Sequence, residues 1–392
     1  MTENNISYKE KLIAHRRNLH MIPELDRNLP KTKAYLLSVL KELDCTLTFL
    51  CDSGICAFFD KGGRDTYGFR ADMDALPVQE TNICSYASTH NGAMHACGHD
   101  GHMSMVLTLA EYVNSAELKH NVLLIFQPAE ETLGGAEEIC KSGILAKHNV
   151  SRVFGIHLWP FLPKGKISSK PGAFMPKSAE INIDIYGKAA HGTAPYEGKD
   201  ALYISADFIN RAYAAHGRLP GAIPHFKEDV KEFPSLSVPP EEKTLIHFGK
   251  MESGYARNIV SDYTHILGTV RAFSEENFNM IISLLKDKLN EISLKYQCDT
   301  EFSNSDGYPP VINDPALYSE IEPVLRKLRG GYEEMKQPLM ISEDFSFYGL
   351  YAPSVFLVLG TGTDIPLHST NFDFDESLLA DGFSLYRALL EG

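Results

Sequence analysis

Apolar positions follow first the period of a helix and then that of a strand. Two helices are predicted near the amino terminus, at residues 8–20 and 31–43, because apolar side chains recur there every three to four positions. Short runs rich in β-branched and aromatic residues predict strands at 46–50, 55–60, 66–71, 122–127 and 152–157. Helices separate them, one with an apolar stripe from Met105 to Val113 and another that begins near Gly135. Strands that alternate with helices indicate a parallel or mixed α/β sheet.

The pattern changes near Pro176. Residues 180–187 alternate between polar and apolar side chains, which is typical of a sheet with one face in water. Further elements of this part are predicted as a helix at 201–214, strands at 243–251 and 264–272, and a helix at 276–294. After Asp306 the earlier rhythm returns, with a helix at 315–327, a strand at 354–359 and a helix at 376–390.

This order predicts a two-domain α/β protein. Residues 1–177 and 296–392 form a mixed-sheet α/β domain, and a smaller α+β domain, residues 178–295, interrupts it. Residues 217–242 are rich in proline, too polar for a core and long for a loop, so we expect them to leave the body of the smaller domain.

Composition and charge restrict the partners of the chain. Its 392 residues are 44% hydrophobic, as in ordinary globular proteins, and 51 acidic against 37 basic side chains give a net charge of -14. Such a surface repels nucleic acid and anionic lipid, so neither is an expected partner. No apolar run reaches the roughly 18 residues that a membrane span needs, and the amino terminus is polar, so a cytoplasmic location is expected. The seven scattered cysteines indicate reduced thiols rather than a disulfide scaffold.

The segment from His95 to His102 has the composition of a metal site. It holds three histidines, one cysteine and one aspartate within eight residues. Cys97 and His99 stand two apart on a loop before a helix, a spacing that can aim a thiolate and an imidazole at one point. His102 lies three residues further on and can face elsewhere.

Other candidate donors follow predicted strands. Glu130 and Glu131 come just after Pro128 ends an apolar strand, and their side chains diverge, so one can bind metal while the other faces water. A Glu pair is more often solvated surface, and His157 or His368 taken alone is as readily a core or loop histidine.

Position joins these separate signals. Ligands of open α/β sheets collect beyond the carboxyl ends of the strands. Four predicted strand ends carry polar side chains, namely Asp72 and Asp74, Glu130 and Glu131, His157, and His368. The expected donors exceed what one tetrahedral ion with an open position can accept, and suit two ions that share a ligand; they are Cys97, His99, Glu131, His157 and His368.

With these motifs the sequence resembles a known family, the two-metal aminoacylase and carboxypeptidase metallohydrolases. It is most similar to the amidohydrolases of N-acyl amino acids, which include auxin-conjugate hydrolases and bacterial N-acetyl-amino-acid deacetylases. The resemblance runs nearly end to end through the segments His15–His20, Phe69–Pro77, His95–His102, Gln127–Glu131, His157–Pro160, Gly187–His191, Ala256–Val260, Ser342–Phe345 and Leu367–Ser369.

The resemblance implies a role for each candidate. The five donors named above would hold two divalent ions, manganese or zinc, with cobalt or nickel as alternatives, and Glu130 would be the general base. The larger domain would be catalytic and the inserted one a lid and dimerisation domain. His191, on a glycine-flanked loop of that lid, would reach across a homodimer to the developing oxyanion.

Weaker expectations concern substrate and support. Asn258 and Arg257 are candidates to hold the acyl or carboxylate end of a substrate, and Arg271 is a candidate with an equally good structural role in its strand. Asp72 and Asp74 are expected to orient ligand histidines. One departure from the family pattern follows His191, where Gly192-Thr-Ala-Pro-Tyr lacks the second histidine of the commoner motif.

The expected activity is hydrolysis of N-acyl, above all N-acetyl, amino acids. A dipeptidase or carboxypeptidase is the rival reading, because the same centre hydrolyses any amide beside a carboxylate. A metal-binding protein without catalysis has no need of Glu130, and a two-metal phosphoesterase fits poorly with a thiolate ligand and no basic phosphate clamp.

Overall fold

The computed structural model describes residues 7–132, 134–216 and 244–392. The chain forms two compact units. Unit 1 comprises Met1–Gly172, Val311–Lys336 and Glu343–Gly392, and unit 2 comprises Ala173–Pro310 and Gln337–Ser342. The predicted fold class is confirmed, since a mixed-sheet α/β unit made from both ends of the chain is interrupted by a smaller α+β unit. The connector at 217–242 lies outside the described residues.

Unit 1 is built on a mixed sheet with the strand order β1-β2-β4-β3-β5-β16-β6-β15. The strands are β1 (Thr46–Leu50), β2 (Gly54–Phe59), β3 (Thr66–Asp72), β4 (Asn121–Gln127), β5 (Val150–Trp159), β6 (Ile167–Ser169), β15 (Tyr332–Glu334) and β16 (Ser354–Gly360). Strands β4, β3, β5 and β16 run parallel to one another, so their carboxyl ends meet at one edge of the sheet.

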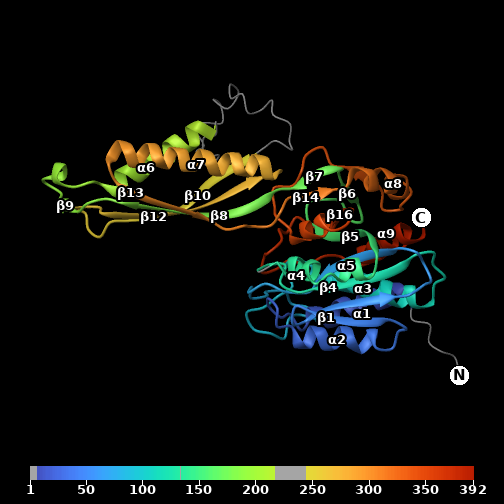
Figure 1. Ribbon diagram of the computed structural model, residues 1–392. Helices are drawn as coiled ribbons and strands as arrows, with labels where there is room; N and C mark the ends of the chain where they lie inside the picture. The colour runs from blue at the N-terminus through green and yellow to red at the C-terminus, as the bar shows by residue number, and fades with distance from the viewer. Residues whose placement is uncertain (1–6, 133, 217–243) are drawn as a thin grey trace. The chain divides into compact units, whose positions relative to one another are not determined.

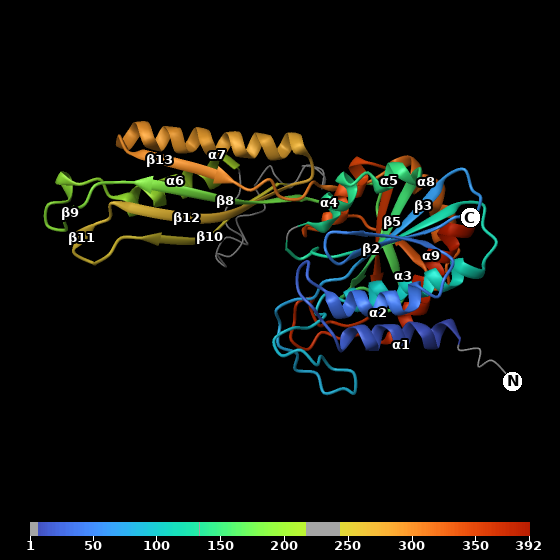
Figure 2. The ribbon, with the colours of Figure 1, turned by 60° about the horizontal axis from the view of Figure 1, so that its bottom comes forward.

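Helices cover both faces of this sheet (Figure 2), with α3 and α9 on one face and α4 and α5 on the other. The helices of unit 1 are α1 (Tyr8–His20), α2 (Pro30–Leu40), α3 (His99–Ser115), α4 (Gly135–Lys141), α5 (Ile144–Lys147), α8 (Pro315–Leu325) and α9 (Leu379–Glu391). Every residue of β3 and β16 is buried, which explains the apolar run from Val355 to Leu359 in β16, whereas β3 also buries the charged side chains of Arg70 and Asp72.

Unit 2 has a sheet of order β10-β12-β8-β13, with α6 and α7 side by side on one face (Figure 1). Its main elements are β8 (Lys177–Tyr186), α6 (Ala201–His216), β10 (Thr244–Ser253), β12 (Tyr263–Ala272), α7 (Glu275–Tyr296) and β13 (Asp299–Asn304). Ile181, Ile183 and Ile185 point from β8 into the core beneath the helices, while the residues between them face solvent. The alternation read from the sequence at 180–187 is therefore confirmed.

Short elements complete the described chain. They are β7 (Gly172–Met175), β9 (Ala190–His191), β11 (Ile259–Val260), β14 (Val311–Asn313) and the 3₁₀ turns η1 (Pro195–Glu197), η6 (Asp344–Leu350) and η7 (Glu376–Leu378). Among the residues described, no helix has both the length and the apolar character that a membrane span needs.

Candidate metal centre

The candidate donors of unit 1 gather where its parallel strands end. Cys97 precedes α3, Glu131 follows β4, His157 lies near the end of β5 and His368 follows β16. Gly98, between Cys97 and His99, has a φ of 83°, and an added Cβ would approach the Leu158 side chain to 3.1 Å. Glycine therefore permits the tight turn that carries Cys97 and His99 toward the same point.

Hydrogen bonds fix the tautomers of two histidines. Nδ1 of His99 lies 2.8 Å from the carbonyl oxygen of Asp74, and Nδ1 of His157 lies 2.7 Å from that of Leu158. A carbonyl oxygen only accepts, so both Nδ1 atoms carry the proton and both Nε2 atoms present a lone pair. Burial lowers the pKa of His157 to about 3 and also lowers that of His99. Both rings are thus neutral, the form that ligates metal.

Cys97 belongs to two groups of potential ligands. Its Sγ atom lies 3.4 Å from Nε2 of His157. The donor atoms of Cys97, His99 and His157 all lie within 4.8 Å of one another, and so do those of Cys97, Glu131 and His368. Burial and the neighbouring carboxylates raise the pKa of the thiol well above its usual range. A bound cation reverses that preference and favours the thiolate.

Glu131 connects the second group to the first. Its Oε1 lies 3.4 Å from Nε2 of His368 and 3.8 Å from Nε2 of His99. Among the described residues, neither this oxygen nor Nε2 of His99 has a hydrogen-bond partner, although both are buried. Buried ligand atoms that lack a hydrogen-bond partner fit a site that a bound cation would complete. His368 adopts a φ of 65°, a rare backbone conformation, and its N–H donates to the carbonyl of Ala96.

Glu130 is held by its backbone beside these donors. The N–H groups of Glu130 and Glu131 each donate to the carboxylate of Asp74 at 3.0 Å, and Ala129 before them has a φ of 60°. One carboxyl oxygen of Glu130 forms a further group with ligand atoms of His99 and Glu131, all within 4.8 Å of one another. Burial, together with nearby carboxylates, raises the pKa of Glu130 well above its usual range. A carboxyl group in this environment keeps its proton more readily than an exposed glutamic acid does.

Asp72 and Asp74 contact the histidines of this region in different ways. Asp74 contacts His99 through its backbone carbonyl, while its carboxylate holds the turn at Glu130. Asp72 accepts a hydrogen bond from His102, 2.6 Å away, and lies 3.6 Å from Nε2 of His99. Nε2 of His102 accepts from the N–H of Leu158, so both ring nitrogens of His102 are occupied.

The other candidates belong to unit 2. His191 is exposed on β9, its Nδ1 lies 2.8 Å from the hydroxyl of Thr193, and the carbonyl of Asn258 accepts from the N–H of Gly192. Arg257 is exposed beside Asn258. Arg271 lies near the far end of β12 and donates to the carbonyl of Met340, while burial lowers its pKa.

Sequence reasoning missed a buried cluster around Arg70. Arg70 belongs to the buried strand β3, and its guanidinium contacts the carboxylates of Asp72, Glu343 and Asp344. A charged residue between Phe69 and Ala71 in a fully buried strand was the available signal, as was the unassigned Glu343-Asp344 pair.

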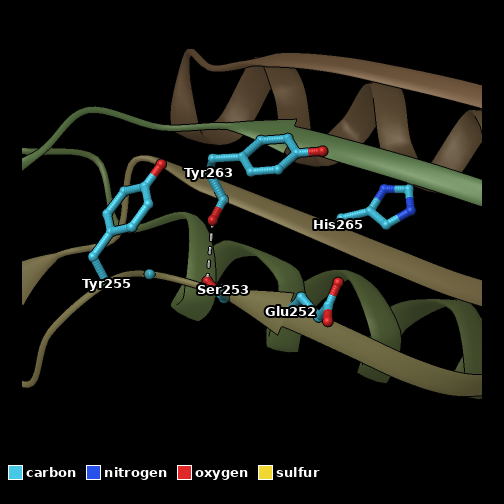
Figure 3. Close-up of a pocket in the computed structure, with 6 residues that line it drawn as sticks. Glu252, Ser253, Tyr255, Tyr263 and His265 are labelled. Carbon is cyan, nitrogen blue, oxygen red and sulfur yellow. Dashed lines mark hydrogen bonds between the residues drawn. The ribbon is translucent and has the colours of Figure 1, made fainter.

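A separate hollow of about 310 Å³ lies in unit 2 (Figure 3). Its lining comes from the end of β10, the following turn and the start of β12, namely Glu252, Ser253, Gly254, Tyr255, Tyr263 and His265. Ser253 donates to the carbonyl of Tyr263 (Figure 3). Asp184 accepts from the hydroxyl of Tyr263 and contacts His265. None of the predicted site residues lines it.

Comparisons place the chain among known hydrolases. Residues 68–392 match the family described as Peptidase family M20/M25/M40. An N-acetyldiaminopimelate deacetylase of Leuconostoc citreum is 32% identical over 398 residues, which cover 100% of this chain and 97% of the relative. An uncharacterized hydrolase of Staphylococcus epidermidis is 31% identical over 386 residues, 96% of each chain. The Bacillus subtilis YXEP protein, described as a dinuclear metal binding peptidase from the M20 family, is 27% identical with a TM-score of 0.80, covering 98% of this chain and 97% of that one.

Proposed function

The chain belongs to Peptidase family M20/M25/M40, and from that premise we propose that this hydrolase cleaves the amide bond of N-acyl amino acids. The products are the free amino acid and the carboxylate of the acyl group, most often acetate. The observation that carries the proposal is that two groups of potential metal ligands share Cys97 and lie beside Glu130. The Leuconostoc citreum deacetylase, similar along the whole chain, supports an N-acetyl substrate.

Two groups of donors fit a pair of divalent cations. Cys97, His99 and His157 would hold one ion and Cys97, Glu131 and His368 the other, with Cys97 as the ligand common to both groups. Thiolate, imidazole and carboxylate together suit zinc or manganese, with cobalt or nickel as alternatives. Such cations supply Lewis acidity, which polarises a carbonyl group and acidifies water.

Glu130 supplies the proton transfer. Its carboxylate takes a proton from the attacking water as the C–O bond forms, and returns that proton to the amine nitrogen as the C–N bond breaks. One water and one amide thus give one carboxylic acid and one amine. Asp74 keeps Glu130 in place through the backbone of the turn.

Residues of unit 2 complete the proposal. His191 donates a hydrogen bond to the oxyanion of the tetrahedral intermediate, and does so from the second chain of a cytoplasmic homodimer. Arg257 and Asn258, beside it, bind the carboxylate or acyl end of the substrate, and Arg271 contributes from β12. Asp72 supports the ligand histidines. It lies 3.6 Å from Nε2 of the ligand His99 and accepts a hydrogen bond from the neighbouring His102.

A dipeptidase is the second candidate, because the Bacillus subtilis relative is described as a peptidase. The deciding experiment compares N-acetyl amino acids with the matching dipeptides on protein stripped by chelator and refilled with manganese, zinc, cobalt or nickel. We expect higher kcat/KM for the N-acetyl compounds. A preference for dipeptides in every metal form would overturn the amidohydrolase proposal and leave the peptidase one.

A further inference from the structure

A group of buried charges, of which the proposed chemistry uses only Asp72, lies next to Glu130. At its centre is Arg70, 1% exposed, whose guanidinium lies 2.8 Å from Asp72, 3.0 Å from Glu343 and 2.7 Å from Asp344. Three carboxylates thus face one cation in the interior of unit 1. The group therefore keeps an excess of negative charge or holds protons.

Asp344 is the anchor of this group. Besides Arg70, its carboxylate accepts hydrogen bonds from the side chain of Gln127, at 2.9 and 2.7 Å, and from the N–H of Ala136 at 3.1 Å. These bonds tie η6 to β4 and α4. Both carboxylate oxygens of Asp344 therefore accept hydrogen bonds from the surrounding scaffold, which is the arrangement of a structural carboxylate.

Glu343 is held differently. One oxygen, Oε1, accepts both from Arg70 at 3.0 Å and from the N–H of Phe345 at 3.1 Å, so the carboxylate caps the amino-terminal end of η6. The side chain is 3% exposed. These two hydrogen bonds to Oε1 hold the carboxylate in place, and neither of them involves Oε2.

Fixed carboxylates on one side determine where Glu130 can point. Oxygen atoms of Glu130, Glu343 and Asp344 lie within 4.8 Å of one another, and Glu130 also groups within 4.8 Å with His99 and Glu131. Glu130 therefore lies within reach of both the fixed Glu343 and the donors of the metal centre. Because Arg70 and Phe345 hold Glu343 in place, its carboxyl group limits how far the Glu130 side chain can turn away from that centre.

We propose that Glu343 is a positioning residue for Glu130, holding the base toward His99 and Glu131 by its fixed carboxylate. This inference rests on the proposed function, in which Glu130 transfers the proton. The effect of Glu343 is on the direction of the Glu130 carboxylate, and a misplacement of about 1 Å at a reacting group costs up to roughly 100-fold in rate.

Glu343→Gln is the decisive variant, because it keeps the shape and an oxygen that accepts from Arg70 and Phe345. Its amide can also donate to Glu130 and draw that carboxylate inward. We expect kcat to fall roughly 10- to 100-fold, with KM and metal stoichiometry unchanged. Glu343→Ala removes charge and shape together, and we expect a similar fall. The control is Glu111→Gln, a half-buried carboxylate on α3 paired with Lys11 at 2.9 Å, which should leave kcat unchanged.

Crystal structures of the metal-loaded wild type and of both Glu343 variants give a readout apart from activity. We expect the carboxylate of Glu130 to turn away from His99 in the variants. An unmoved Glu130 in a folded variant, or a Glu343→Gln enzyme with the kcat of the wild type, overturns the proposal. A wild type that hydrolyses no amide defeats the proposed function alone, because the position of Glu130 still decides the role of Glu343.

Discussion

The Sγ atom of Cys97 lies 3.4 Å from Nε2 of His157, although 60 positions separate the two residues along the chain. The thiol also groups with Glu131 and His368, so that one side chain faces both proposed cation positions. A substitution at Cys97 therefore tests both positions at once.

Replacing the shared thiol should empty both positions. We expect Cys97→Ser to bind fewer than one divalent ion per chain where the wild type binds two, because an alcohol stays protonated and is a weak ligand. Elemental analysis after dialysis measures this. Cys298→Ser, a buried cysteine of unit 2, is the control and should keep both ions. Two tightly held ions in Cys97→Ser would show that the thiol is not a ligand.

The base can be separated from the ligands. Glu130→Gln should retain two ions and lose roughly 10²- to 10⁴-fold in kcat, because the amide cannot accept the proton. Kinetics and metal analysis on the same preparation test it. Glu137→Gln, a half-buried residue of α4 paired with Lys141, should behave as the wild type. Loss of an ion in Glu130→Gln would place Glu130 among the ligands instead.

Metal removal should be visible without substrate. Trp159 is the single tryptophan, and its ring lies 5.9 Å from that of His157. Ligation through His157 changes the surroundings of the indole, so we expect chelator to shift the tryptophan emission and manganese or zinc to restore it. Chelator should also lower Tm, since ligand at 1,000 times its Kd stabilises the fold by about 4 kcal/mol. A flat titration, or the same response in Cys97→Ser, argues against metal at His157.

The role of His191 predicts complementation between inactive chains. If His191 acts across a homodimer, a mixture of Glu130→Gln and His191→Ala subunits should regain up to about a quarter of wild-type activity, because one site in each mixed dimer is complete. Unfolding and refolding the two variants together, and separately as controls, makes the measurement. A mixture with no gain over the separate variants contradicts action across the dimer.

A buried histidine outside the centre predicts how stability depends on pH. Burial opposes the charge on His20, but Asp100 at 2.8 Å and Glu80 at 3.1 Å outweigh it and raise the pKa to about 9. The folded protein therefore binds this proton more tightly than the unfolded chain, whose His pKa is about 6.5. The stabilisation is complete below pH 6.5 and is lost as the pH rises through 9.

The loss amounts to about 3 kcal/mol in the free energy of unfolding across that window. Urea unfolding of chelator-treated protein between pH 6 and 10 measures it, with His20→Gln as the comparison. The variant should be less stable at pH 6.5 and should lose less stability than the wild type on going to pH 9. Parallel curves for the two proteins would mean that His20 is not the group that titrates.

Much of the fold followed from local pattern. The helices at 8–20 and 201–214 and the strands at 46–50, 66–71 and 354–359 lie within one or two residues of α1, α6, β1, β3 and β16. Short strands such as β6, β9 and β11 were not predicted, because two or three residues show no hydrophobic period and their pairing partners are distant in sequence. The predicted helix at 376–390 divides into η7 and α9.

By itself the sequence determined which residues stand at the ends of the parallel strands, and thereby which donors could meet, because strand direction and apolar period are local properties. Only the tertiary structure decided how they meet. It showed that Cys97 belongs to both ligand groups and that both ring nitrogens of His102 are hydrogen-bonded, to Asp72 and to Leu158. It also showed that Arg70 pairs with buried carboxylates next to Glu130. Those facts depend on distances between side chains far apart in the chain, and on the burial that makes an unshared charge costly, neither of which a linear pattern contains.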